Sequence, residues 1–183
     1  MPEQKPRIAT TSLAGCFGCH MSLLDIDDRI LQLLELVNFD KSPIDDFKEI
    51  TQQCAVGLIE GGCCNEENVE VLRDFRKKCD LLVSIGDCAT MGGIPALRNT
   101  VPLKECLAEA YLNGPTVFNP SGLLPDDDEV PMILNWVFPA HEVVKIDYYL
   151  PGCPPPADTL FAALVALLSD QPVELPYELI KYD

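Results

Sequence analysis

The sequence predicts an α/β fold in which helices cover both faces of one parallel sheet. Short apolar runs that end in glycine alternate with longer segments of helical periodicity, a pattern typical of β–α–β units. The chain has 183 residues, of which 48% are hydrophobic and 23% charged, so it is long enough to bury one core. We therefore expect a single domain over residues 1–183.

The first quarter of the chain predicts a strand, a helix and an edge strand. Residues 7–13 are rich in β-branched side chains, which favours a strand. Residues 21–37 repeat apolar side chains at helical spacing, which predicts one helix. Residues 40–43 have the composition of a loop, and residues 47–51 are a candidate edge strand.

Two buried strands and two helices follow. The short apolar runs at 55–59 and 81–85 each end next to glycine, as buried parallel strands do. The amphipathic segment 66–78 between them predicts a helix. Residues 102–112 predict another helix, with proline at its start.

The last third of the chain is less regular. We expect irregular structure at 113–131, helix at 132–136, a strand at 143–150 and a helix at 156–169, followed by an extended segment. Four or five strands in this alternating order are typical of a flavodoxin-like, doubly wound domain, which binds ligands beyond the carboxyl ends of its strands.

The charge and the cysteine content restrict the class of protein. A formal charge of −16 disfavours binding to nucleic acid or to anionic lipid. The acidic run 126–129 is either a solvated loop tip or a docking patch for a basic partner. We expect no secretory signal and no membrane insertion, since the start of the sequence is not apolar and its longest apolar run, 160–168, is too short to span a bilayer. We expect a cytoplasmic protein whose nine cysteines are metal ligands or buried thiols.

Four cysteines follow predicted strands. Cys16 and Cys19 lie at C-x2-C spacing after the first strand, Cys88 follows the strand at 81–85, and Cys153 follows the last. Since carboxyl ends of parallel strands share one edge of the sheet, we expect one site. Four thiolates suit a [4Fe–4S] cluster or tetrahedral zinc, and ligands spread over several loops favour the cluster. Taken alone, the C-x2-C pair also fits unrelated core thiols or a thioredoxin-like redox pair.

Other polar residues near these loops have two interpretations each. Glu60 ends a strand and is either a proton relay or acceptor at the site, or a charge that pairs with the next helical turn. His20, beside Cys19, could donate to the cluster or to a neighbouring residue, but a position at the surface or as a helix cap is favoured. The other five cysteines are expected to be small buried hydrophobic residues: Cys54, Cys63, Cys64, Cys79 and Cys106. Of these, Cys63 and Cys64 could replace a ligand. We find no nucleotide-binding fingerprint and no hydrolase triad.

With these blocks the sequence resembles the small subunit of [NiFe] hydrogenases. The matching residues are Gly15-Cys16-Phe17-Gly18-Cys19, Glu60-Gly61, the run from Gly86-Asp87-Cys88 to Ile94, and Leu150-Pro151-Gly152-Cys153-Pro154-Pro155. The resemblance implies that Cys16, Cys19, Cys88 and Cys153 bind one proximal [4Fe–4S] cluster. It also implies that this cluster faces the nickel–iron centre of a separate large subunit, so that the active site lies outside this chain.

The resemblance is strongest to the soluble, bidirectional NAD(P)-reducing hydrogenases. Periplasmic relatives carry a twin-arginine signal and a carboxyl-terminal extension with further clusters, and we expect neither here. The implied role is electron transfer to a diaphorase module that contains FMN and iron–sulfur clusters. The cluster subunit of complex I shares two blocks but has adjacent cysteines in the first motif. That difference disfavours a cluster subunit of a complex I-like quinone reductase, which stays one alternative function. The others are a flavodoxin-like FMN carrier, a zinc-stapled interaction module and a dithiol oxidoreductase.

Overall fold

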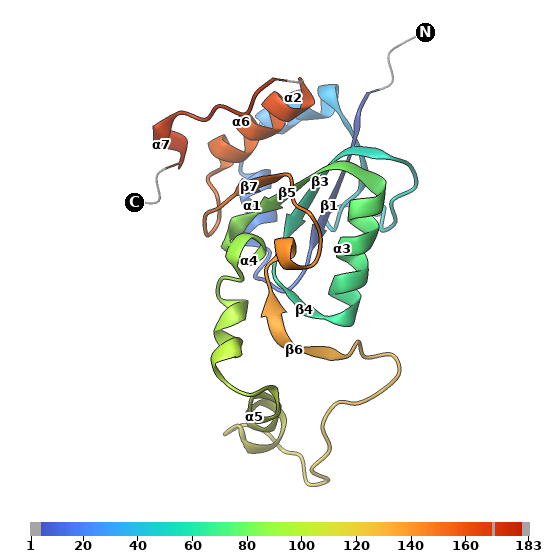
Figure 1. Cartoon of the computed structure of the whole chain (residues 1–183), viewed down its shortest axis with the longest axis vertical. Helices are drawn as coiled ribbons and strands as arrows, with labels where there is room; N and C mark the ends of the chain where they lie inside the picture. The colour runs from blue at the N-terminus through green and yellow to red at the C-terminus, as the bar shows by residue number, and fades with distance from the viewer. Residues whose placement is uncertain (1–4, 170, 181–183) are drawn as a thin grey trace.

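A five-stranded parallel sheet forms the centre of the molecule (Figure 1). The computed structural model describes residues 5–169 and 171–180. The strand order is β2-β1-β3-β5-β7, which is the flavodoxin order, and it confirms the predicted fold class. The strands are β1 (Arg7–Ser12), β2 (Asn38–Lys41), β3 (Cys54–Glu60), β5 (Cys79–Ile85) and β7 (Tyr148–Leu150).

Helices cover both faces of the sheet and create two apolar cores. On one face, α1 (Gly18–Leu24), α2 (Arg29–Leu36) and α6 (Ala157–Leu168) bury side chains that include Leu58. On the other, α3 (Glu66–Lys78) packs Leu72 and Phe75 against side chains that include Ile59. Because successive side chains of a strand point to opposite faces, one apolar run supplies both cores.

The helix expected at 21–37 is interrupted. Helix α1 ends at Leu24 and α2 begins at Arg29, and Asp27 between them has φ 61. Aspartate has low helical propensity and tolerates the left-handed region better than most residues do. Leu23, Ile26 and Leu33 still lie in the same core. The apolar residues therefore keep a helical spacing in the sequence although the helix is interrupted by a turn.

The edge strand is β2 rather than the expected segment 47–51. The carboxylate of Asp40 accepts hydrogen bonds from the backbone N–H of Thr51 (2.6 Å), the Thr51 hydroxyl (2.7 Å) and Arg7 (2.8 Å). Burial alone would raise the pKa of Asp40, but the bonds from Thr51 and the charge of Arg7 hold that pKa below its usual value. The amide of Thr51 is therefore bound by a side chain and not by a neighbouring strand.

A second, two-stranded sheet replaces the expected helix at 132–136. Strand β6 (Ile133–Phe138) pairs antiparallel with β4 (Cys63–Asn65), which the sequence did not predict. Aromatic and β-branched residues make β6 a good strand once a partner is available, and the partner lies about seventy residues away in the chain. Of the strand expected at 143–150, only residues 148–150 form a strand, β7, and the segment before it follows the short helix η3 (Ala140–Glu142).

The remaining elements lie around the sheet and beyond one end of it. Helix α4 (Gly86–Met91) and η1 (Pro95–Thr100) were not predicted, whereas α5 (Leu103–Ala108), continued by η2 (Glu109–Asn113), confirms the helix at 102–112. The terminal segment includes a short helix, α7 (Tyr177–Ile180), and the rest of the predicted extension, 181–183, lies outside the described residues. None of the helices in the described ranges has the length and apolarity needed to cross a bilayer.

Gly57 sits where β3 has no room for a side chain, and Gly57→Ala should destabilise the fold. An added Cβ would lie 2.7 Å from Leu82 Cδ2 and 2.8 Å from Cys79 Sγ. Overpacking of this kind costs about 1–3 kcal/mol, which a urea unfolding midpoint would detect. Gly15→Ala is the control, because its Cβ would have no heavy atom closer than 3.5 Å. Equal midpoints for the two variants would contradict the packing assignment.

Candidate iron–sulfur site

The first cysteine loop connects β1 to α1 at the carboxyl edge of the sheet. It is held there by backbone hydrogen bonds from Leu13 N to Glu60 O (2.8 Å) and between Ala14 and Gly62 in both directions (3.0 and 2.7 Å). Helix α1 begins directly after Phe17, so Cys19 lies in its first turn and is buried while Cys16 is exposed.

The loops of Cys88 and Cys153 are bonded to each other. Cys88 lies on α4, which begins immediately after β5, and Cys153 follows β7. Asp87 N donates to Gly152 O (2.9 Å), and Gly152 N donates to the Asp87 carboxylate (2.7 Å). The hydroxyl of Ser22 on α1 donates to Pro155 O (2.6 Å). Three chain segments that are far apart in sequence are thus fixed at one edge.

Glycines leave the space that the thiols occupy. A Cβ on Gly86, whose φ is +78, would overlap Cys19 Sγ and would lie 3.5 Å from Gly152 O. A Cβ on Gly93 would lie 3.0 Å from Cys88 Sγ. The end of β5 therefore forms a cradle for Cys19 that no side-chain-bearing residue could provide.

The four thiols share one electrostatic environment. The pKa of Cys19 is raised to about 12, first by burial and then by negative charge on Glu60, Cys88, Cys16 and Cys153, in that order. Burial also raises the pKa of Cys88, and the charges of Cys153 and Cys16 add to the rise. A hydrogen bond from the backbone of Ile94 acts in the opposite direction and lowers that pKa. Four clustered thiolates are therefore unfavourable without cations between them, and bound iron would supply this positive charge.

The arrangement gathers four sulfur donors from three loops. Within residues 5–169 and 171–180, no three Cys, His, Asp or Glu side chains close around a single ion position. Four thiols from three loops, spaced around glycines, match the ligand requirement of a [4Fe–4S] cube, in which each sulfur binds a different iron. Four thiolates also satisfy tetrahedral zinc, so the donor set by itself fits both groups.

The other five cysteines lie outside this group. Cys54, Cys63 and Cys79 are buried in the core, as predicted, while Cys64 and Cys106 are half-buried. The Cys64 thiol donates to the side-chain oxygen of Asn68 (3.5 Å). None of the five is among the charges that act on Cys19, so the structure gives no support to Cys63 or Cys64 as substitute ligands.

Glu60 and His20 form a buried pair behind the first cysteine loop. The expectation of a surface or capping role for His20 is wrong, since its side chain is 0% exposed and that of Glu60 is 2% exposed. Glu60 Oε2 accepts from His20 N (3.0 Å) and contacts His20 Nδ1, while His20 Nε2 lies 3.1 Å from the Thr10 hydroxyl. Of the two interpretations of Glu60, the pairing with a helical turn is found at a different helix: the carboxylate bonds the backbone N–H of His20 in the first turn of α1, and not the turn that follows Glu60 in the chain. The sequence signal for the pair was a histidine beside a ligand cysteine and a carboxylate at a buried strand end.

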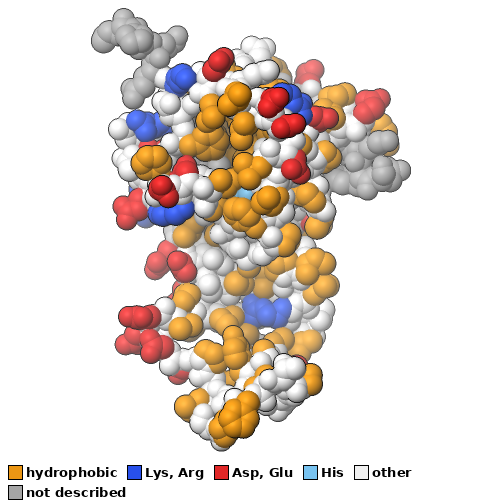
Figure 2. Space-filling view, turned by 180° about the vertical axis from the view of Figure 1, so that it is seen from behind, with side chains coloured by type: hydrophobic (Ala, Val, Ile, Leu, Met, Phe, Trp, Pro, Cys, Tyr) orange, Lys and Arg blue, Asp and Glu red, His pale blue; other side chains and the backbone are white. Residues whose placement is uncertain are grey.

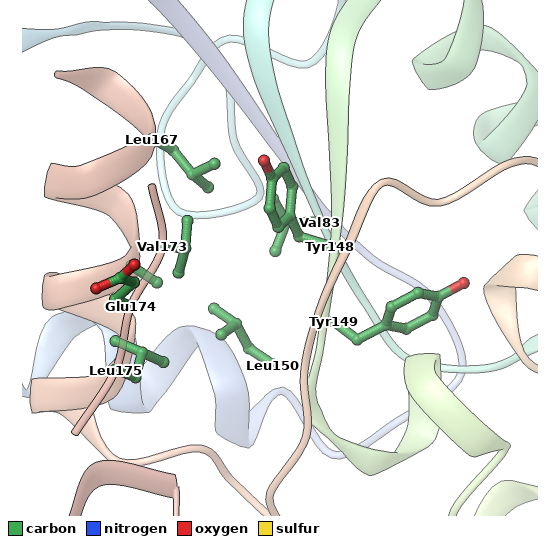
Figure 3. Close-up of a pocket in the computed structure, with 9 residues that line it drawn as sticks. Val83, Tyr148, Tyr149, Leu150, Leu167, Val173, Glu174 and Leu175 are labelled. Carbon is green, nitrogen blue, oxygen red and sulfur yellow. The ribbon is translucent and has the colours of Figure 1, made fainter. Parts of the chain in front are cut away.

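A cavity of about 480 Å³ lies at the open edge of the sheet, between β7, α6 and the terminal segment (Figure 3). Its lining is apolar and aromatic except for Glu174, and it includes Tyr148, Leu167 and Val173. A phosphate of FMN would meet a carboxylate and no lysine or arginine here. The chemistry of this cavity therefore does not favour the FMN-carrier alternative.

Comparisons with known proteins identify relatives along almost the whole chain. Residues 16–167 match the family model of the NADH ubiquinone oxidoreductase 20-kDa subunit. The delta subunit of the NAD-reducing hydrogenase HoxS from Cupriavidus necator is 47% identical over 99% of this chain and 87% of its own length. A subunit of the F420-non-reducing hydrogenase from Methanothermobacter thermautotrophicus is 39% identical over 94% of this chain, which spans 56% of that protein.

Solved structures agree with these matches. A chain of the crystal structure of the NAD+-reducing [NiFe]-hydrogenase in its H2-reduced state has a TM-score of 0.93 and 48% identity, covering 98% of this chain and all of that one. A chain of the [NiFeSe]-hydrogenase from Desulfomicrobium baculatum has a TM-score of 0.59 at 19% identity, which shows a shared fold.

The raised pKa of Cys19 predicts slow alkylation of this thiol in the iron-free protein. At pH 8 a pKa of about 12 leaves roughly a thousandfold less thiolate than the ordinary value of 9.0. Iodoacetamide followed by peptide mass spectrometry should label exposed Cys153 at least tenfold faster (~10×) than Cys19, and the rate at Cys19 should rise as the pH is raised. Denaturant should remove the difference. Equal rates in the folded protein would contradict the burial of Cys19.

Proposed function

The chain belongs to the small subunits of the NAD-reducing [NiFe] hydrogenases, within the family of the NADH ubiquinone oxidoreductase 20-kDa subunit, and we propose that it serves as their electron-transfer bridge. In this proposal Cys16, Cys19, Cys88 and Cys153 bind one [4Fe–4S] cluster. The observation that carries it is the convergence of these four thiols from three loops. The loops follow parallel strands whose carboxyl ends lie at one edge of the sheet.

A bound cluster would supply one-electron chemistry, and the protein supplies its position and surroundings. The Asp87–Gly152 hydrogen bonds hold the loops of Cys88 and Cys153 together, and Ser22 ties α1 to the second of them. Burial of Cys19 places that ligand in the apolar interior. These fixed contacts limit the rearrangement that electron transfer would otherwise require.

The cluster edge presents an apolar surface to a partner. Met21, Met91 and Ile94 lie next to the cysteine loops in sequence and are 50%, 60% and 69% exposed. Exposed apolar side chains around a ligand site are typical of a surface that a partner protein covers. We propose that the [NiFe] large subunit covers it, holding the hydrogen-activating site against this edge and excluding water from the cluster.

The second transfer partner in this proposal is a diaphorase module. In this proposal, hydrogen oxidation in the large subunit releases electrons to the cluster of this chain, and NAD(P)+ accepts two electrons as hydride from a flavin. The chain has no nucleotide-binding fingerprint of its own. Its role is therefore to pass electrons between the two modules, in the direction that their potentials set.

Substitution of a proposed ligand should remove the cluster. Cys88→Ser and Cys153→Ser should each lose iron and acid-labile sulfide, and the assembled complex should lose nearly all hydrogen-dependent NAD(P)+ reduction. Iron analysis and EPR spectroscopy of anaerobically prepared dithionite-reduced protein give the measurement. Cys106→Ser is the control, because the thiol of Cys106 forms a weak hydrogen bond to Val101 O (3.9 Å) and is not among the charges that act on Cys19. Full iron content and turnover in both ligand variants would refute the assignment.

Glu60 distinguishes two roles, and we propose that it positions the Cys19 turn. Its carboxylate bonds the His20 backbone, so Glu60→Gln, which can still accept that bond, should keep the cluster EPR signal and most turnover. Glu60→Ala should lower cluster occupancy, because a buried bond to a charged group contributes about 1.5–3 kcal/mol. If Glu60 is instead a proton relay, Glu60→Gln will slow turnover while the cluster stays intact. Rates across a pH series separate the two roles.

A further inference from the structure

One part of the molecule is well formed but has no core of its own. Residues 94–136, here called the distal lobe, extend beyond the end of the sheet and contain η1, α5, η2 and the start of β6 (Figure 1). No residue of the distal lobe is buried. A segment that buries so little apolar area gains little stability from its own packing, so it is expected to be stabilised by contact with something else.

The distal lobe exposes large apolar side chains. Phe118 is 91% exposed, Leu123 71%, Met132 60% and Trp136 54%. Figure 2 shows apolar side chains distributed over this end of the molecule, with acidic side chains along one border. Concentrated exposure of this kind marks an interaction surface rather than an ordinary solvated face.

Some apolar side chains of the distal lobe line a groove, although Phe118 and Leu123 are not among them. A hollow of about 530 Å³ lies between the α5–η2 helix, which contributes Leu103, Leu107 and Tyr111, and the segment 125–133. The spacing of these three residues, four apart, puts them on one face of the helix. A second hollow of about 450 Å³ shares Leu103 and continues to Trp136. The two hollows meet at Leu103, and polar side chains such as Asn99 and Asn135 share the lining of the second one with apolar side chains.

The border of the groove is acidic. Asp126, Asp127 and Asp128 line it, and none of them takes part in a salt bridge with a described residue. The distal lobe carries six acidic residues against two basic ones, Arg98 and Lys104. Arg98 is bonded to Leu134 O (2.9 Å). Acidic residues therefore outnumber basic ones in the lobe, which carries a net negative charge.

We propose that the groove of the distal lobe binds a basic, amphipathic segment of another subunit of the hydrogenase complex, an apolar ridge bordered by lysine or arginine. Apolar contact area and charge complementarity are both needed for such an interface, and the groove offers the matching half of each. This inference rests on the proposed function, because it takes the chain to be one subunit of a larger assembly.

Site-specific cross-linking in the assembled complex tests the occupant. A photoreactive benzoylphenylalanine at Met132 should cross-link to a different subunit, and peptide mapping should place the adduct within a few residues of lysine or arginine. A cross-link to a second copy of this chain, to a segment without basic residues, or to no other chain would overturn the proposal. The readout does not require iron, so it is independent of the ligand assignment.

Two sets of variants separate the apolar contribution from the charge. Leu107→Asp should reduce recovery of the complex by about tenfold or more, as loss of a central apolar anchor does. Since this variant could also perturb α5, the triple variant Asp126→Asn, Asp127→Asn, Asp128→Asn gives a second test. It should weaken association several-fold (~3–10×) and reduce its dependence on salt.

The matched control removes three exposed acids from the other end of the molecule. Glu35→Gln, Asp46→Asn and Glu49→Gln change the net charge by the same amount and should leave association and salt dependence unchanged. Equal weakening by the two triple variants would show a general effect of net charge and would overturn the groove as the binding site.

Discussion

The reciprocal hydrogen bonds between Asp87 and Gly152 are the interaction on which the candidate site depends. They join the end of β5 to the loop after β7, so that Cys88 and Cys153, sixty-five positions apart, are held at one place. The cradle at Gly86 then brings Cys19 to the same place from α1. The Asp87–Gly152 hydrogen bonds and the contact of Cys19 with Gly86 act over short distances. Both require that the parallel sheet first aligns the carboxyl ends of its strands.

The sheet domain and the distal lobe have different physical roles. The domain has two apolar cores and supports the cysteine loops on strands that are buried at both faces. The distal lobe has an exposed groove and acidic side chains that form no salt bridge with a described residue, so its stability depends more strongly on what it contacts. A subunit that transfers electrons between partners needs both a rigid centre for short transfer distances and an adaptable surface for docking.

Local sequence signals were sufficient where the pattern of apolar residues in a segment matches the side chains that it buries. The strands around 55–59 and 81–85 and the helix at 66–78 were predicted, because apolar periodicity reports burial directly. Prediction failed where a distant contact determines the structure. Residues 133–138 form a strand because β4 lies beside them, and Thr51 is held by Asp40 instead of by a neighbouring strand.

The sequence by itself determined the fold class, the family resemblance and the four cysteines at strand ends, because the pattern of apolar runs and the cysteine blocks are local properties of the chain. Tertiary structure decided which groups surround the thiols. The burial of His20 against Glu60, the space left by Gly86 and the groove of the distal lobe all arise between segments that are remote in sequence. Such contacts depend on the packing of whole elements, and no local periodicity encodes them.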